Sequence, residues 1–186
     1  MANTCFTTYK IVGKKEEIEQ LHGKLQELEN MKEALLKSDY GNLWLGCLVH
    51  ILGGNWQEVY CRGRVICFQM DEKNDCLEVC TETAWAEMEE VRHFIQKVFP
   101  SLNIYFYEEE PMMEIYRTND KEGRFFKGKY IFDDMEGEGE DYYNTEKEVL
   151  KIASECMGRT FSDLEELEEA VGESDDFSFH KVEICA

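Results

Sequence analysis

Cysteine and histidine are the residue types in this chain best suited to nucleophilic or metal chemistry. The eight cysteines are Cys5, Cys47, Cys61, Cys67, Cys76, Cys80, Cys156 and Cys185, and the four histidines are His22, His50, His93 and His180. A cysteine nucleophile needs a histidine base and an orienting group close in space. No local signature of such a site occurs, and no Cys-x-x-Cys pair supplies the usual spacing of zinc ligands.

Cys76 and Cys80 are the cysteines with the most suggestive spacing. In a strand, side chains repeat on one face every two residues, so these two thiols would point the same way. That geometry leaves a soft-metal site open, but small buried apolar side chains are the better interpretation. With no export signal in view, reduced thiols are expected. We therefore predict no metal, no cofactor and no catalytic residue.

The acidic segment Asp133–Asp141 is the other candidate for ion binding. It has many oxygen ligands but lacks the EF-hand pattern, in which ligands at alternating positions lead to a placed glycine and a terminal glutamate. Weak, nonspecific binding of divalent cations is all that this segment predicts. No glycine-rich phosphate loop is present, and Gly53-Gly54 indicates a turn.

The negative charge of the chain is concentrated near one end. Residues 133–176 contain 17 carboxylates and three basic side chains, a net charge of −14 out of −20 for all 186 residues. Such a field opposes compaction and repels phosphates, but it attracts a basic surface. Direct binding to nucleic acid or to an anionic membrane is therefore disfavoured. Solubility alone would also explain much of this charge.

Composition and hydropathy indicate a globular protein. The chain is 43% hydrophobic and 12% aromatic, enough to build a core. No stretch approaches the roughly 18 apolar residues that span a bilayer, and no leader pattern precedes the first strand. A cytoplasmic location is expected, which would be the host cytoplasm if a phage or plasmid encodes the chain.

Periodicity predicts the order of elements up to Asp133. Leu21 and Leu25 belong to an apolar stripe on a helix over Lys14–Lys37, and Thr83 is expected to cap a second helix from Ala84 to Phe99. The inward positions are Ile18, Leu21, Leu25, Leu28 and Leu35 on the first helix and Met88, Val91, Ile95 and Val98 on the second. Strands are predicted at Thr4–Val12, Arg64–Met70, Cys76–Glu82 and Leu102–Tyr107, with a turn at residues 72–75.

This order is β-α-β-β-α-β, which predicts an α+β fold: a ferredoxin-like split βαβ antiparallel sheet with two helices on one face. The domain would span residues 1–132, with an insertion at about 39–58. Within the insertion, the apolar run Leu43–Leu52 fits either a buried strand or a short helix. Residues 133–186 would form an acidic helical extension with a closing strand at Phe177–Ile184. Its two helices would begin at capping boxes, Thr145 with Glu148 and Ser162 with Glu165.

Three short motifs resemble those of the YubB-type ferredoxin-like domain proteins found on plasmids and other mobile elements. They are Thr83-Ala84-Trp85, the turn Phe99-Pro100-Ser101-Leu102, and the strand Ile104-Tyr105-Phe106-Tyr107 with its acidic end. The resemblance is specific over residues 81–110. Ala86 stands where that family has a proline, and only Gly53-Gly54-Asn55-Trp56 remains of its tryptophan-rich segment. The resemblance implies a fold and a mobile-element context, with no catalytic residues.

Taken together, these features predict a non-enzymatic acidic interaction protein. It would occupy the basic nucleic-acid-binding surface of a partner protein, as an anti-CRISPR-like, anti-defence inhibitor would do with a Cas effector. Carboxylates at regular spacing would imitate phosphates and speed association. The candidate partner-binding residues are Glu136, Glu138, Glu140, Asp141, Glu165, Glu166, Glu168 and Glu169.

The alternative hypothesis is a small enzyme or ligand-binding domain that uses a cleft near Trp44, His50 and Trp56. A compact pocket with a convergent Cys–His pair would favour this hypothesis. A continuous acidic face would favour the interaction protein.

Overall fold

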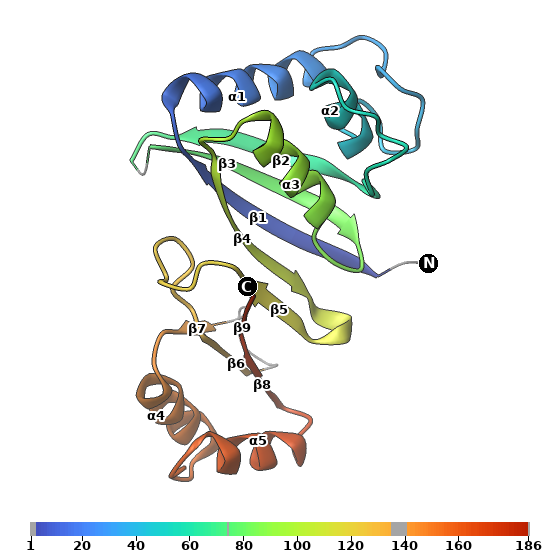
Figure 1. Ribbon diagram of the computed structural model, residues 1–186. Helices are drawn as coiled ribbons and strands as arrows, with labels where there is room; N and C mark the ends of the chain where they lie inside the picture. Colours follow the sequence, from blue (N-terminus) through green and yellow to red (C-terminus); the bar gives the residue numbers. More distant parts are fainter. Residues whose placement is uncertain (1–2, 74, 135–140, 186) are drawn as a thin grey trace. The chain divides into compact units, whose positions relative to one another are not determined.

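The structure is a computed structural model that describes residues 3–73, 75–134 and 141–185. It is an α+β structure, and the chain divides into two compact units, Met1–Ile115 and Tyr116–Ala186. The helices and strands of both units are labelled in Figure 1.

In the first unit, strands and helices are interspersed along the chain. Its elements are β1 (Thr4–Val12), α1 (Lys15–Glu29), α2 (Leu45–Ile51), β2 (Gly63–Asp71), β3 (Cys76–Ala84), α3 (Glu89–Val98), β4 (Asn103–Glu110) and the 3-10 turn η1 (Pro111–Met113). The strands lie in the order β2-β3-β1-β4. Each described pair is antiparallel, and β1 pairs with β3 on one side and β4 on the other. The helices α1, α2 and α3 lie on one side of this sheet (Figure 1).

The core of the first unit lies between the sheet and its helices. Leu21 and Leu25 of α1 line the same 30 Å³ cavity as Leu48 of α2 and Val91 of α3. Ile11, Val65, Val79 and Ile104 face that cavity from the four strands. The helical periodicity therefore identified the buried stripe correctly, except at two positions. Val98 is only half-buried, and Leu35 is 38% exposed.

Leu35 is exposed because α1 is shorter than the apolar stripe suggested. The helix ends at Glu29, and the Asn30 N–H closes it by donating to the Gln26 carbonyl. Within the ambiguous run Leu43–Leu52, residues Leu45–Ile51 form a helix, α2, and not a strand. Leu45, Cys47, Leu48 and Val49 are all buried there.

The predicted start of the second helix is wrong by five residues. Thr83 and Ala84 continue the ladder of β3, where they pair with Cys5 and Thr4. Trp85 then adopts a left-handed conformation, with φ 75°. The Thr83 hydroxyl donates to the Ala86 carbonyl at 2.7 Å and caps no helix. The helix α3 begins only at Glu89.

The second unit has its own small core. Its helices are α4 (Glu146–Met157) and α5 (Leu164–Gly172). The strand β6 (Tyr130–Asp134) lies between β7 (Asp141–Tyr143) and β8 (Phe177–Lys181), and both pairs are antiparallel. A parallel pair joins β5 (Ile115–Thr118) and β9 (Glu183–Ile184). The helices bury Val149, Ala153, Leu167 and Ala170 against Phe132 and Phe161.

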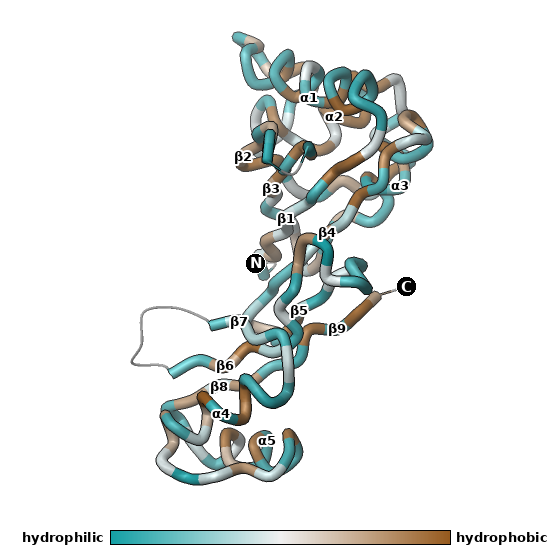
Figure 2. Tube along the Cα trace, turned by 90° about the vertical axis from the view of Figure 1, so that its left-hand side faces the viewer, coloured by the Kyte–Doolittle hydropathy of each residue, from teal (hydrophilic) through white to brown (hydrophobic). Residues whose placement is uncertain are grey.

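Two expectations for this region change. We expected a division of the chain after residue 132, but β6 contains Ile131 and Phe132 and pairs with β7 and β8. The closing strand predicted at Phe177–Ile184 is present as β8 and β9, but the region also contains β7, so it is more than a helical extension with one closing strand. Polar and apolar residues alternate along its helices and strands (Figure 2), as they do in elements that bury one face and expose the other.

The two predicted capping boxes had different outcomes. Thr145 and Glu148 form the predicted box at the start of α4. In α5 the cap is shifted by one residue: the Asp163 carboxylate accepts from the Glu166 N–H at 2.9 Å, and Glu166 accepts from the Ser162 N–H at 2.9 Å. Asp163 can replace Ser162 as the cap because both side chains offer an oxygen to the free N–H groups of the first turn.

None of the helices in the part of the chain that the structure describes is long and apolar enough to cross a bilayer.

The shared core generates the first prediction. Leu25 is 1% exposed, so Leu25→Ala should lower the free energy of unfolding by about 2–5 kcal/mol. Leu25→Asp should lower it further, because a carboxylate there would be buried without a partner. Leu35→Asp is the matched control and should change it by at most about 0.5 kcal/mol, since Leu35 is exposed. Urea unfolding followed by circular dichroism measures all three. Equal stability of Leu25→Asp and wild type would contradict this packing.

Candidate functional site

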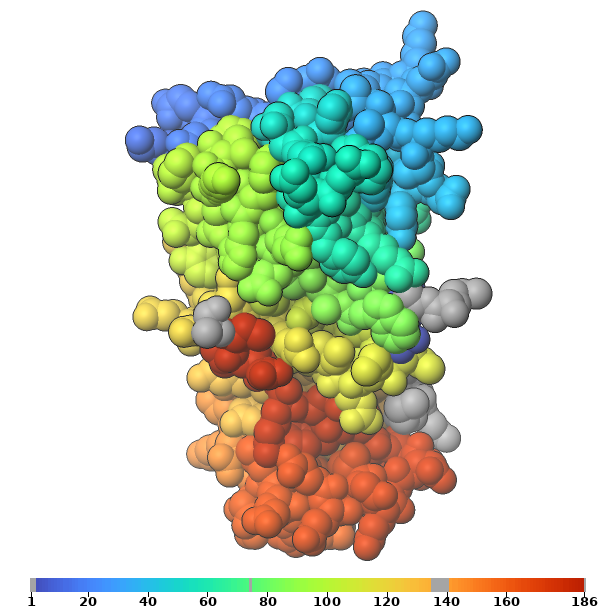
Figure 3. All heavy atoms as spheres, turned by 45° about the vertical axis from the view of Figure 1, so that its right-hand side comes forward, coloured from blue at the N-terminus to red at the C-terminus, as the bar shows by residue number. Residues whose placement is uncertain are grey.

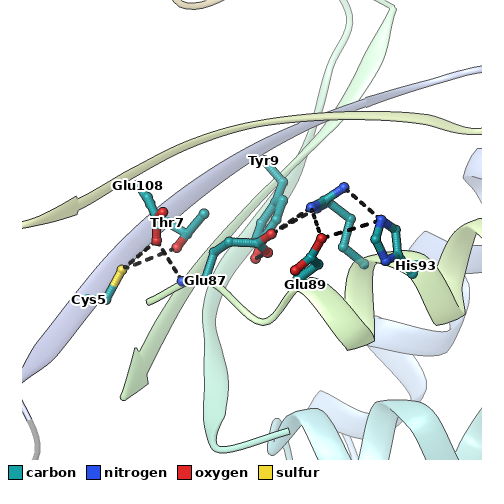
Figure 4. Close-up of polar contacts among 8 residues, drawn as sticks. Cys5, Thr7, Tyr9, Glu87, Glu89, His93 and Glu108 are labelled. Carbon is teal, nitrogen blue, oxygen red and sulfur yellow. Dashed lines mark hydrogen bonds and ion pairs between the residues drawn. The ribbon is translucent and has the colours of Figure 1, made fainter. Parts of the chain in front are cut away.

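A buried polar network lies at one end of the helix-covered sheet face in the first unit (Figure 4). It is built by strand alternation. Cys5, Thr7 and Tyr9 are alternate residues of β1 and point to the helix side, where they are buried. Across the ladder, Thr7 lies opposite Glu108 of β4. Glu108 is 2% exposed, so its carboxylate depends on protein groups for its hydrogen bonds.

The Glu108 carboxylate binds the segment that leads into α3. Its Oε2 accepts from the Glu87 N–H at 2.7 Å and lies 3.5 Å from the Cys5 Sγ. The Cys5 Sγ is also 3.7 Å from the Thr7 hydroxyl. Through these contacts, the Glu108 carboxylate connects β4 with β1 and with the segment before α3.

The Glu87 carboxylate forms a second point of attachment. It accepts from the Tyr9 hydroxyl at 3.0 Å and from Arg92 Nε and Nη2 at 3.0 and 2.8 Å. The Arg92 guanidinium also lies 5.0 Å from the centre of the Phe106 ring. Both side chains of this ion pair are largely buried, with 12% exposure for Arg92 and 6% for Glu87.

Burial controls the protonation of this network. It raises the pKa of Cys5 to about 12, with the negative charge of Glu108 as the second cause. It also raises the pKa of Glu87, although Arg92 and Tyr9 act in the opposite direction. The Cys5 thiol is therefore protonated at neutral pH and acts as a donor, whereas nucleophilic catalysis requires a thiolate. His93 lies at the edge of the network, 58% exposed and 3.9 Å from Glu89. The network suits anchoring of the Glu87 segment better than cysteine chemistry.

The cleft considered in the alternative hypothesis exists in part. A groove of about 570 Å³ is lined by Tyr40, Trp44, Trp56, Tyr60, Arg62 and Glu90, among others, and we call it the aromatic groove. Figure 3 shows the surface segments around residues 40–60, in light blue and turquoise. His50 is exposed on α2 and is not among the residues that line the groove.

Hydrogen bonds and ring contacts hold the aromatic groove in shape. The Trp44 Nε1–H donates to the Cys61 carbonyl at 2.8 Å, and the Trp44 and Trp56 rings meet edge to face at 5.1 Å. The Tyr60 N–H donates to the Glu90 carboxylate at 2.6 Å. Hydrogen bonds with the Tyr40 and Tyr60 side chains raise the pKa of Arg62. The groove thus offers flat apolar walls, the Arg62 cation and the carboxylates of Glu58 and Glu90.

The structure brings together only some of the predicted partner-binding residues. Glu165, Glu168 and Glu169 are exposed on α5, and their three- and four-residue spacing places them on one face. We call these three residues the acidic strip. Glu166 is instead engaged locally, because it accepts from Ser162 and pairs with Arg159 at 3.3 Å. Asp141 is exposed on β7. Glu136, Glu138 and Glu140 lie outside the described residues.

The cysteines show one pairing that sequence reasoning missed. Cys76 and Cys80 do not meet: Cys76 is fully buried, and Cys80 lies directly opposite Cys67 of β2. The signal was present in the hairpin. A turn at residues 72–75 pairs Asp71 with Cys76. Four residues farther from the turn on each strand, Cys67 pairs with Cys80. Among residues 3–73, 75–134 and 141–185, no three potential metal ligands come together.

Comparisons with protein-family models, with curated proteins and with solved structures found no match to this chain.

The raised pKa of Cys5 generates the second prediction. At pH 8 only about one in ten thousand of these thiols would be ionised, so Cys5 should resist iodoacetamide until the protein unfolds. The exposed Cys156 should react readily in the native protein. Mass spectrometry after timed alkylation measures both rates.

Two variants separate charge from burial in this test. Glu108→Gln removes the negative charge beside the thiol, so the Cys5 pKa should fall and alkylation at pH 9 should become faster. Glu109→Gln is the matched control on the other side of β4 and should leave the rate unchanged. Labelling of Cys5 as fast as that of Cys156 in folded wild-type protein would show that this thiol is not controlled by burial.

Proposed function

We propose that this chain is a non-enzymatic, acidic interaction protein whose second unit docks on the basic, nucleic-acid-binding surface of a partner protein. The observation that carries the proposal is the acidic strip. Glu165, Glu168 and Glu169 share an exposed face of α5, within a region whose net charge is −14.

The geometry of α5 makes this strip a reasonable substitute for phosphates. The helix rises about 1.5 Å per residue, so Glu165 and Glu168 are about 4.5 Å apart along its axis. Successive phosphates on one DNA strand rise about 3.4 Å. The buried Leu167 and Ala170 fix the rotation of α5, which keeps the carboxylates directed toward solvent. A rigid row of like charges steers a basic partner and speeds association.

Neighbouring cations reduce this field only in part. Lys181 forms an ion pair with Glu168, and Arg159 pairs with Glu166 beside the strip. These are exposed pairs, so each contributes little and can exchange for a cation of the partner. Glu165 and Glu169 add two further exposed carboxylates to the same face.

The order of elements in the first unit supports a proposal about its fold. We infer a ferredoxin-like split βαβ domain, from the antiparallel strand order β2-β3-β1-β4 with α1 and α3 in the two crossovers. The resemblance over residues 81–110 adds a mobile-element context. An anti-defence inhibitor that acts in the cytoplasm on a Cas effector is the most concrete form of the proposed function.

The aromatic groove supports a second candidate function, that of a ligand-binding domain. Trp44 and Trp56 present flat rings beside Arg62 and Glu90, an arrangement suited to a small ligand with both apolar and polar groups. The protonated Cys5 and the exposed His50 lend no support to an enzyme of the Cys–His class.

The acidic strip generates the third prediction. The triple variant Glu165→Lys, Glu168→Lys, Glu169→Lys should lose capture of basic nucleic-acid-binding proteins from a nuclease-treated bacterial lysate. Wild-type capture should weaken as salt rises, because exposed charges are screened beyond about 8 Å at physiological ionic strength. Quantitative mass spectrometry of the captured proteins measures both effects.

The matched control changes the same charge elsewhere. Glu16, Glu19 and Glu27 are exposed on α1 of the first unit, and their reversal to lysine should leave capture largely intact. If both triple variants lost capture equally, the net charge of the protein would explain capture, and docking through the strip would be refuted. Loss in Trp56→Ala, with capture intact in the strip variant, would instead favour the aromatic groove.

A further inference from the structure

Two cysteines face each other across the hairpin of β2 and β3. Cys67 and Cys80 are direct partners in the antiparallel ladder. The Cα atoms of directly opposed residues in such a ladder are about 4.5–5.5 Å apart. A disulfide spans Cα separations of about 4.4–6.8 Å. The Cα separation of this pair in the ladder therefore falls within the range that a disulfide spans.

Both thiols point away from the helices. The next residues along the strands, Phe68 and Val79, are paired with each other and face the helix side. Phe68 packs edge to face on His22 of α1 at 5.6 Å, and Val79 lines the interior cavity. Cys67 and Cys80 therefore lie on the opposite side of the sheet. Cys67 is exposed and Cys80 is half-buried, whereas Cys5, Cys47, Cys61 and Cys76 are buried.

Cys67 lies on β2, the strand of the first unit that a crosslink to its neighbour would stabilise most. In the order β2-β3-β1-β4, β2 pairs with β3 and forms the edge of the sheet in the first unit. Its register with β3 shifts between Val65 and Cys67, which marks a bulge. A bulge interrupts the ladder hydrogen bonds locally. A covalent bond at Cys67–Cys80 would clamp the edge strand directly beside that interruption.

We propose that Cys67 and Cys80 form a reversible dithiol–disulfide site on the helix-free side of the first unit, with glutathione disulfide as the oxidant. The site is reduced in a reducing cytoplasm and closes when the glutathione pool is oxidised. It is independent of the acidic strip, which belongs to the other unit.

The oxidation balances in two exchange steps. The Cys67 thiolate attacks one sulfur of glutathione disulfide, whose S–S bond breaks as a Cys67–glutathione bond forms and one glutathione thiolate leaves. Cys80 then gives up its proton and attacks the Cys67 Sγ, which releases the second glutathione. The two cysteines lose two electrons and two protons, and the oxidant becomes two glutathione thiols.

The surroundings of Cys80 set the order of these steps. Burial raises its pKa to about 11, and its contact with the Cys67 thiol is the second cause. Its Sγ also lies 3.9 Å from the Thr8 hydroxyl. Cys80 is therefore protonated at neutral pH and less accessible, so the exposed Cys67 takes the first glutathione and Cys80 resolves it.

The test uses the native full-length protein and glutathione disulfide. After acid quenching and alkylation in denaturant, wild type should show neither an alkylated nor a glutathione-bound thiol at Cys67 and Cys80, whatever glutathione the exposed Cys156 has taken up. Proteolysis and mass spectrometry should recover crosslinked peptides that contain residues 67 and 80, lighter by two hydrogens than the reduced pair. Prior unfolding in urea should abolish this selectivity, because the ladder that aligns the thiols is gone.

Three variants assign the roles. Cys80→Ser should accumulate glutathione on Cys67, since nothing resolves the mixed disulfide. Cys67→Ser should acquire far less glutathione on Cys80. Cys156→Ser, which removes the exposed thiol of α4, is the matched control and should close the 67–80 bond as wild type does. Stable glutathione on both Cys67 and Cys80 in wild type, or persistence of both free thiols, would overturn the proposal.

Discussion

The first unit depends on how it accommodates a carboxylate that is almost fully removed from water. Glu108 is 2% exposed, and the burial of a charge is tolerable only when hydrogen-bond donors surround it. The register of β1 and β4 places Glu108 opposite Thr7. The Glu108 carboxylate also accepts from the Glu87 N–H at 2.7 Å. Glu87 in turn engages Tyr9 and Arg92. One buried charge thereby links a strand register, a connecting segment and the start of α3.

The same constraint explains what sequence reasoning could and could not find. The β-branched and aromatic residues of Thr4–Val12, followed by Gly13, predicted β1 with its bounds, because these residue types favour strands and glycine favours a turn. The apolar spacing of Leu21, Leu25 and Val91 likewise identified the core. The start of α3 was missed because Thr83 resembles a helix cap, whereas it pairs with Cys5 of β1, which is distant in sequence, and its hydroxyl donates to the Ala86 carbonyl. Contacts of that kind leave no local pattern.

The candidate sites follow the same division between local and distant information. The acidic strip was visible in the sequence, since its members are neighbours on one helix; only the hydrogen bond of Glu166 with Ser162 needed the structure. The aromatic groove was anticipated at Trp44 and Trp56, but Tyr40, Tyr60 and Glu90 come from separate segments. His50 was misplaced because the run Leu43–Leu52 could not be assigned to a helix or a strand, and that assignment decides where a side chain points.

The placement of tryptophan has a consequence for how the chain can be observed. All three tryptophans, Trp44, Trp56 and Trp85, belong to the first unit. Intrinsic tryptophan emission therefore comes from the first unit alone, whereas far-ultraviolet dichroism detects the helices and strands of both units. Two optical probes that are usually interchangeable become selective in this molecule. A difference between their transitions would measure directly how much of the cooperativity of folding is shared by the two units.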